Sequence, residues 1–280
     1  MRWQGRRQSD NIDDRRGNTN PFFFTGGLGA VALIAIYILF GRDPNEVIQQ
    51  TLQQTNAPTQ VFSEREEKLA SFTKVVLADT EDVWDSIYQS IGDRYQQPTL
   101  VLFSGSTSSG CGFASAASGP FYCPSDKQIY IDLSFFDELS QRFEVEGEFA
   151  MAYVIAHEVG HHVQQQMGTT TKLQQMKSGI SEMEYNRLSV KLELQADFLA
   201  GVWAHHAQKL NNILEVGDIE AALKAANAIG DDHLQKSAGK MVNPDAFTHG
   251  TSKQRMYWFK KGFETGDITK GNTFSSTELP

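Results

Sequence analysis

The sequence predicts a helix-dominated α+β domain with a small β-sheet, together with one N-terminal transmembrane helix. Residues 22–40 form a long uncharged apolar stretch, and after Gly147 apolar residues recur at helical spacing behind repeated capping signals. Only residues 99–103 and 128–133 have the β-branched and aromatic composition of strands. The predicted division is a disordered cytoplasmic tail (1–21), a transmembrane helix (22–40), a polar linker (41–62) and a folded domain (63–280).

The charge of the chain is unevenly distributed. Of the net charge of −9, residues 1–21 contribute five arginines and three aspartates, which is +2, so the remaining residues carry −11. An acidic body without a basic stripe argues against nucleic-acid binding. The chain has only two cysteines, Cys111 and Cys123, which excludes a disulfide-dense scaffold and a zinc module built from four cysteines.

The apolar stretch at 22–40 has 19 residues without a charge or a proline. At about 1.5 Å rise per residue, a helix of this length nearly spans the ~30 Å hydrocarbon core of a lipid bilayer. No A-x-A-like cleavage site follows it, so we expect an uncleaved single-pass anchor. A cleaved signal peptide and a buried core helix are the alternatives.

The orientation of this anchor follows from the bias of basic residues. Five arginines precede the stretch, whereas only Arg42 appears between residues 41 and 61. The positive-inside rule therefore predicts an inner-membrane protein with its N-terminus in the cytoplasm and residues 41–280 in the periplasm or another extracytoplasmic space.

The folded domain is predicted to contain several helices. Ser63 and Glu66 form a capping box before one helix, and a second helix is expected after Thr80. The later helices are expected over about 148–167, from Ser181 to about 208, over 218–229, and from Thr251 to about 262.

The stretch "VIAHEVGHHVQQQMG" (154–168) carries the strongest chemical signal. His157 and His161 are spaced i and i+4, so one face of a helix presents both imidazoles to a single metal ion. Glu158 lies one step round the helix, where a carboxylate can take a proton from a metal-bound water without binding the metal. His162 points about 100° away from His161 and is not expected to be a ligand.

A catalytic zinc usually has three protein ligands and one open position, so another ligand is needed. A third histidine six residues after His161 is excluded because position 167 is Met. The later stretch "ELQADFLAG" (193–201) offers Glu193 as the ligand. Asp197, one turn on, is expected to bind the far ring nitrogen of a ligating histidine. An antiparallel helix pair would bring the two stretches together.

Four blocks, "AHEVGHHVQ", "ELQADFLAGVWA", "GPFYCPSDKQIYIDLSFF" and "FTHGTSKQRMYWFKKGFETGD", resemble the bacterial family described as "putative neutral zinc metallopeptidase". The resemblance covers nearly the whole chain. It implies a membrane-anchored, zincin-like metallopeptidase domain of gluzincin pattern. It also implies Zn²⁺, with His157, His161 and Glu193 as ligands and Glu158 as the catalytic residue. It implies no particular substrate.

In gluzincin-like enzymes, a residue outside the zinc helices stabilises the developing oxyanion. His249 is the first candidate for this role, with Arg255 and Tyr257 behind it. The alternative is that His249 only shapes a helix start. Cys111 and Cys123 are expected to form a disulfide worth about 3 kcal/mol outside the cytoplasm, with free thiols or a second metal site as alternatives.

The expected activity is hydrolysis of a peptide or protein substrate by a zinc-activated water, with Glu158 as general base. Residues 119–131 are expected to form either an edge strand that binds the peptide or an ordinary core strand. Two other functions stay open: a zinc hydrolase acting on a non-peptide envelope substrate, and a membrane scaffold that uses zinc only for stability. The intact Glu158 argues against the scaffold, because a structural site needs no general base.

Overall fold

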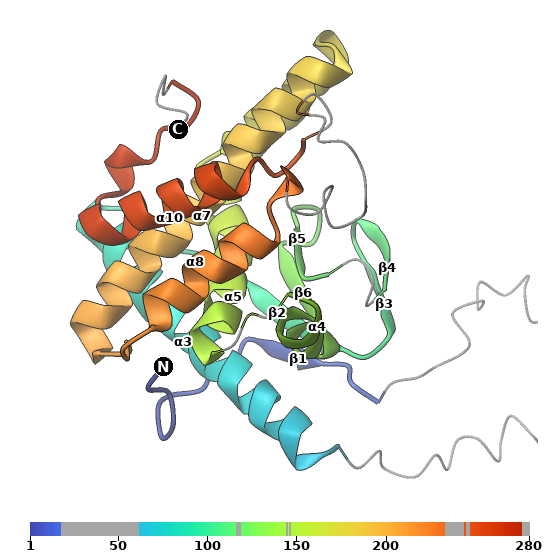
Figure 1. Ribbon diagram of the computed structural model, residues 1–280. Helices are drawn as coiled ribbons and strands as arrows, with labels where there is room; N and C mark the ends of the chain where they lie inside the picture. Colours follow the sequence, from blue (N-terminus) through green and yellow to red (C-terminus); the bar gives the residue numbers. More distant parts are fainter. Residues whose placement is uncertain are drawn as a thin grey trace, which may run out of the picture.

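Helices pack against one face of a small mixed sheet in the computed structural model of this protein (Figure 1). The structure describes residues 1–17, 62–115, 119–143, 145, 147–232, 244 and 247–275. Its strands are β1 (Ile12–Asp14), β2 (Thr99–Phe103), β3 (Ser106–Ser109), β4 (Gly112–Ser115), β5 (Phe121–Cys123) and β6 (Gln128–Asp132). Its helices are α3 (Glu64–Ser90), α4 (Ser134–Phe143), α5 (Glu148–Gln166), α6 (Thr169–Met176), α7 (Glu182–Asn211), α8 (Asp218–Ala228) and α10 (Ser252–Thr265), with 3₁₀ turns at Lys177–Gly179 and Ile268–Lys270. The predicted helix-dominated α+β class is confirmed.

The main sheet has the strand order β1-β2-β6-β5. Strands β1, β2 and β6 run parallel, and β5 pairs antiparallel with β6 at one edge. Side chains alternate between the two faces of a strand, so Leu100 and Leu102 of β2 join the helices in the main core. Val101 and Phe103 point to the other face, where they pack in a smaller cluster with Tyr130.

The local signals place most helix starts correctly. Ser63 and Glu66 exchange both bonds of a capping box at the start of α3, and Thr251 and Gln254 do the same at α10. The predicted break at Thr80 is wrong, because α3 is one continuous helix. Inside it, the Thr80 hydroxyl bonds the carbonyl oxygen of Leu77 at 2.7 Å and leaves the helix intact.

The predicted loop between the two strand signals contains structure of its own. Residues 106–115 form the antiparallel hairpin β3–β4. Cys111, in its turn, is joined by a disulfide to Cys123 of β5. The disulfide therefore holds the hairpin against the edge strand of the main sheet.

The predicted disordered tail is wrong for residues 1–17, which pack into the folded domain. The Trp3 side chain is 7% exposed and its ring lies edge-on to Phe72 at 5.5 Å. The Arg6 guanidinium pairs with the Asp79 carboxylate. Ile12 lies opposite Leu100 in the parallel pairing of β1 with β2. Low hydrophobicity and high charge predict disorder only when the charges lack partners, and here α3 supplies them.

This packing bears on the orientation inferred from the arginines. The described residues among 1–17 and 62–275 share one sheet and one core, so the two parts would lie on the same side of a membrane. That differs from the predicted arrangement, in which the tail is cytoplasmic and the domain is not. The predicted transmembrane helix at 22–40 lies outside the described residues. Among the described helices, none has the length and apolar composition needed to cross a bilayer.

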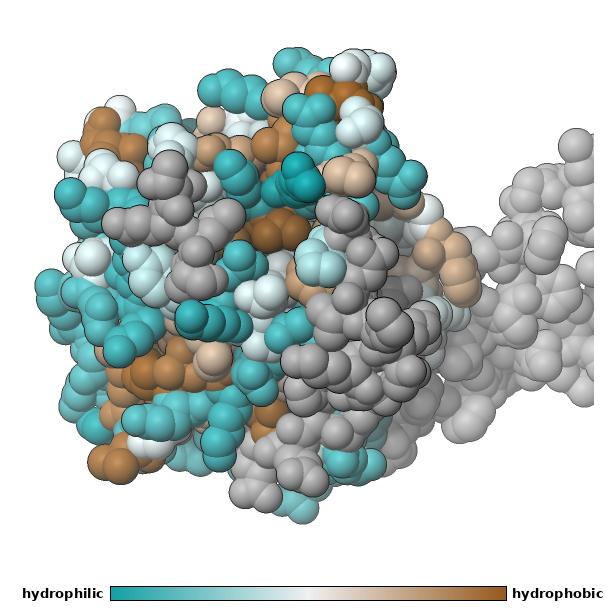
Figure 2. Space-filling model, turned by 45° about the horizontal axis from the view of Figure 1, so that its top comes forward, coloured by the Kyte–Doolittle hydropathy of each residue, from teal (hydrophilic) through white to brown (hydrophobic). Residues whose placement is uncertain are grey.

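Two close helix crossings determine which side chains meet in the interior. A Cβ atom at Gly160 of α5 would lie 3.0 Å from the Ala196 carbonyl oxygen of α7, and one at Gly262 of α10 would lie 2.0 Å from the Phe198 carbonyl oxygen. Glycine therefore allows α5, α7 and α10 to approach backbone to backbone. On the face shown in Figure 2, the described surface is mainly hydrophilic, with hydrophobic residues exposed in separate patches.

Candidate metal centre

The structure brings together three of the predicted site residues on two helices. The ligating atoms of His157, His161 and Glu193 lie within 4.8 Å of one another. His157 Nε2 is 3.2 Å from one carboxylate oxygen of Glu193, and His161 Nε2 is 3.5 Å from the other. The i, i+4 spacing on α5 supplies the two imidazoles, and the crossing of α5 with α7 supplies the carboxylate.

This group of three fits a zinc ion. Zinc takes imidazole nitrogen and carboxylate oxygen at about 2.0–2.2 Å, so ligand atoms in a tetrahedral site are about 3.4 Å apart. The two Nε2 atoms lie 3.2 and 3.5 Å from different carboxylate oxygens of Glu193, which is close enough for one ion to contact all three side chains. Three protein donors also leave one coordination position open, as in catalytic sites.

Both imidazole rings are held at the nitrogen that does not face this group. His157 Nδ1 is 2.9 Å from Asp197 Oδ1, and because an ionised carboxylate only accepts, Nδ1 carries the proton. His161 Nδ1 lies 2.9 Å from Gln164 Oε1. The amide nitrogen of Gln164 donates to the Leu192 carbonyl oxygen of α7 at 2.7 Å. In both rings the Nε2 lone pair is left for the metal.

Asp197 sits at the centre of a buried network. Its side chain is fully buried and accepts hydrogen bonds from the Arg255 guanidinium at 2.8 and 3.0 Å and from the Tyr153 hydroxyl at 2.5 Å. Burial alone would raise the pKa of Asp197, but Arg255 and His157 lower that pKa to about 2. The carboxylate is therefore ionised at neutral pH and orients the His157 ring.

Glu158 is buried beside this group. The residue is 7% exposed, and its carboxylate accepts a hydrogen bond from the backbone N–H of Tyr122. Burial is the main reason that the pKa of Glu158 is raised, although His157 and His161 oppose the shift. A carboxylate with a raised pKa is a better proton acceptor near neutral pH.

The metal-ligating group opens into a cavity of about 420 Å³. Apart from the ligands and Glu158, its walls are mostly uncharged and come from β5, α4, α6, α7 and the end of α8. The lining residues are Gly119, Pro120, Phe121, Tyr122, Pro124, Phe135, Val154, His157, Glu158, His161, Thr170, Leu192, Glu193, Ile229, His249 and Arg255. An apolar cavity with a few convergent polar groups is typical of a substrate site.

Of the three predicted oxyanion candidates, His249 and Arg255 line the cavity. The Nδ1 atom of His249 is 3.2 Å from Asp231, and its side chain is half exposed. The Arg255 guanidinium is bound to Asp197. Tyr257 is not among the lining residues.

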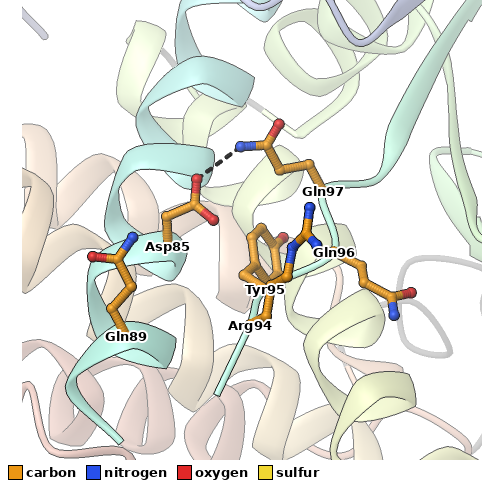
Figure 3. A pocket seen from close by; sticks show the side chains of 6 residues that line it. All are labelled: Asp85, Gln89, Arg94, Tyr95, Gln96 and Gln97. Atoms are coloured by element: carbon orange, nitrogen blue, oxygen red, sulfur yellow. Dashed lines mark hydrogen bonds between the residues drawn. The ribbon is translucent and has the colours of Figure 1, made fainter. Parts of the chain in front are cut away.

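A larger cavity, of about 580 Å³, lies elsewhere and is polar (Figure 3). It is lined by Asp85, Gln89, Arg94, Tyr95, Gln96 and Gln97. Its single carboxylate, on Asp85, accepts a hydrogen bond from the Gln97 amide at 2.8 Å. Six lining residues with no histidine or cysteine do not form a zinc site, so the chemistry belongs to the cavity at His157.

Two supporting residues were not predicted from the sequence. Tyr153 lies four residues before His157, on the same face of α5, and Gln164 lies three residues after His161. Their helical spacing from the ligands was a usable signal. Their role depends on α7, because both contact residues of that helix.

The fold and the site together define a protein in which an HExxH helix, α5, and a glutamate of the later helix α7 could hold one metal ion. The chain matches the family described as "putative neutral zinc metallopeptidase" over residues 1–274. It belongs to that family, as the resemblance implied. The match begins at residue 1, so it includes the segment that packs on α3.

Relatives in two bacterial groups share most of this chain. YpfJ of Escherichia coli strain K12 is 45% identical over 287 residues, which cover 99% of this chain and 100% of the relative. Rv2575 of Mycobacterium tuberculosis strain H37Rv is 37% identical over 257 residues, which cover 86% of each chain. Both are named as uncharacterized proteins. No solved structure matches this chain.

We expect Asp197→Asn to weaken zinc binding about 10- to 100-fold, because the amide no longer gives His157 a charged acceptor. The measurement is competition for zinc with a chelator, with circular dichroism to follow folding, since the change leaves Arg255 without its charged partner. Asp132→Asn is the matched control: Asp132 is also buried but bonds the backbone at Gly105 and Ser134. Equal zinc affinity in the Asp197 variant and wild type would contradict this role.

Proposed function

We propose that this protein is a zinc-dependent peptidase that hydrolyses peptide bonds. The observation that carries the proposal is the position of buried Glu158 beside a set of three metal ligands, in a single cavity. A structural zinc site would favour four protein ligands and would need no buried carboxylate next to them. The family supports the same class of activity.

Zinc, when bound by His157, His161 and Glu193, would lower the pKa of a water molecule and polarise a carbonyl group. Glu158 then has the position and the raised pKa of a general base, and after bond cleavage it can return the proton to the leaving amine. The cavity walls are mostly uncharged, and electrostatic interactions are stronger beside such walls than in bulk water.

His249 is proposed to stabilise the negative charge that develops on the substrate carbonyl oxygen. Asp231 accepts hydrogen bonds from the backbone N–H groups of Thr248 and His249 at 2.7 and 2.6 Å, and it also contacts the His249 ring. This contact with Asp231 is the main reason that the pKa of His249 is raised, with Glu193 adding to the shift and burial and Arg255 opposing it. A protonated imidazole at the cavity is a suitable donor to an oxyanion.

The substrate is proposed to bind as an extended strand along β5. This strand is at the edge of the sheet, and Phe121 and Tyr122 line the cavity. An edge strand offers backbone groups that an added strand can pair with. If the substrate bound through its backbone, the residues that line the cavity would select among substrate side chains.

We expect Glu158→Gln to keep zinc but to lower peptide hydrolysis by about 10²- to 10⁴-fold, because the amide cannot accept the proton. The measurement is metal content together with mass-spectrometric profiling of cleavage in a peptide mixture. Glu148→Gln, on the same helix, is the control and should cleave normally. An unchanged profile in Glu158→Gln would favour a scaffold, and cleavage of envelope material alone would favour a non-peptide hydrolase.

We expect Asp231→Asn to lower the pKa of His249, because the ring loses its charged acceptor. The alkaline limb of the pH profile of kcat/KM should then move to lower pH by about one unit, since His249 acts in its protonated form. Asp267→Asn, at an exposed turn near the end of α10, is the control. An alkaline limb at the same pH in both variants and wild type would remove His249 from the reaction.

We also propose that the protein acts outside the cytoplasm, attached to the bilayer through residues 22–40. The Cys111–Cys123 disulfide supports this compartment, because disulfides persist outside the reducing cytoplasm. The uncharged apolar composition of residues 22–40 supports attachment. The core that residues 1–17 share with the described domain supports a placement of both on the same side of the bilayer.

Single cysteines at exposed Asp10 and Lys260 test this placement with a membrane-impermeant thiol reagent. In spheroplasts with an intact cytoplasmic membrane, both Asp10→Cys and Lys260→Cys should be labelled. Deletion of residues 22–40 should release the protein from the membrane fraction. Labelling of neither cysteine would place the body in the cytoplasm, and labelling of only one would contradict the shared core.

A further inference from the structure

His162 has an unassigned role next to the metal centre. It follows the ligand His161, but its ring faces away from the metal-ligating group and is 1% exposed. The ring lies between two tyrosines: its centroid is 5.7 Å from that of Tyr95 and 5.4 Å from that of Tyr122, both edge-on. His162 is therefore packed at the contact of α5, β5 and the chain that leads into β2.

The two ring nitrogens of His162 have fixed and different partners. Nε2 lies within hydrogen-bond distance of the Gln96 carbonyl oxygen, and the Gln166 amide nitrogen is 2.7 Å from the same ring nitrogen. Nδ1 forms a hydrogen bond of 3.1 Å with the Tyr122 hydroxyl, which can serve as donor or acceptor. Burial lowers the pKa of His162 to about 4, so the ring is neutral at pH 7.

Tyr122 connects this contact to the candidate general base. Its hydroxyl is held by His162, and its backbone N–H donates to the Glu158 carboxylate. Strand β5 has only three residues and pairs with β6 alone among the described strands. Hydrogen bonds of the sheet therefore hold β5 on one side only, and the His162–Tyr122 contact holds it toward α5.

We propose that His162 is a positioning residue: through Tyr122 it fixes β5 against α5 and so fixes the Glu158 carboxylate at the cavity. The catalytic importance of this position rests on the proposed peptidase function, but the position itself does not. The inference gives the two adjacent histidines of α5 separate tasks. His161 faces the metal, and His162 holds the wall of the cavity that carries the edge strand.

The test is amide hydrogen exchange of the zinc-free full-length chain, followed by mass spectrometry. The variants are His162→Phe, which keeps an aromatic ring but no hydrogen bond, Tyr122→Phe, and the two combined. Loss of the hydrogen bond should speed exchange in the segment containing residues 119–124 about fivefold in each variant. The double variant should exchange no faster than the single ones, because both remove the same contact.

His206→Phe is the matched control, since this histidine bonds the Gly266 carbonyl oxygen and does not contact β5 or Tyr122 in the described hydrogen bonds. Exchange in residues 119–124 should be unchanged there. Unchanged exchange in His162→Phe, equal acceleration in every segment, or additive effects in the double variant would overturn the proposal. Zinc affinity should be unchanged in His162→Phe, because His162 is not a ligand.

Peptide cleavage separates this inference from the proposed function. If the wild type cleaves peptides, His162→Phe and Tyr122→Phe should lower kcat by similar factors, because both displace Glu158. If the wild type cleaves no peptide, the proposed function fails, and the exchange measurement still decides whether His162 positions β5.

Discussion

The buried ion pair between Asp197 and Arg255 is the interaction on which the rest of the site depends. Both side chains are almost fully excluded from water, so each is tolerated only because of the other and of the hydrogen bonds around them. Removing one partner would leave an uncompensated buried charge, which costs about 3–5 kcal/mol. The pair joins α7 to α10, and the contact of Asp197 with His157 joins both to α5. Stability and metal geometry therefore share one network.

The N-terminal segment shows how charge complementarity overrides composition. Read alone, its arginines indicate a free basic tail and suggest which side of a membrane it occupies. In the folded protein Arg6 and Arg7 pair with Asp79 and Glu81 of α3, and β1 completes the sheet. Part of the negative charge of the folded domain thus serves to bind the N-terminal arginines of the same chain. The chain therefore leaves this folded body after residue 17 and rejoins it at residue 62.

The placing of the two candidate imidazole ligands on one helix face could be predicted because helical spacing is local. The i, i+4 pair His157 and His161 lies on one face of any α-helix, and exclusion of a third histidine by Met167 left Glu193 as a ligand. The β3–β4 hairpin and β1 could not be assigned in the same way, because short strands depend on pairing with distant residues, whereas an edge strand within residues 119–131 was one of the two expectations. The break expected at Thr80 failed because a threonine is tolerated inside a well-packed helix.

By itself, the sequence determined most of the helix starts and the placing of His157 and His161 on one helix face, since each depends on neighbours within one or two helical turns. The tertiary structure decided which polar groups support that site. Arg255 meets Asp197 because Gly262 lets α10 approach α7, and Tyr122 meets His162 because β5 is the edge strand beside α5. These contacts join residues far apart in the chain, and no local pattern encodes the distance between them.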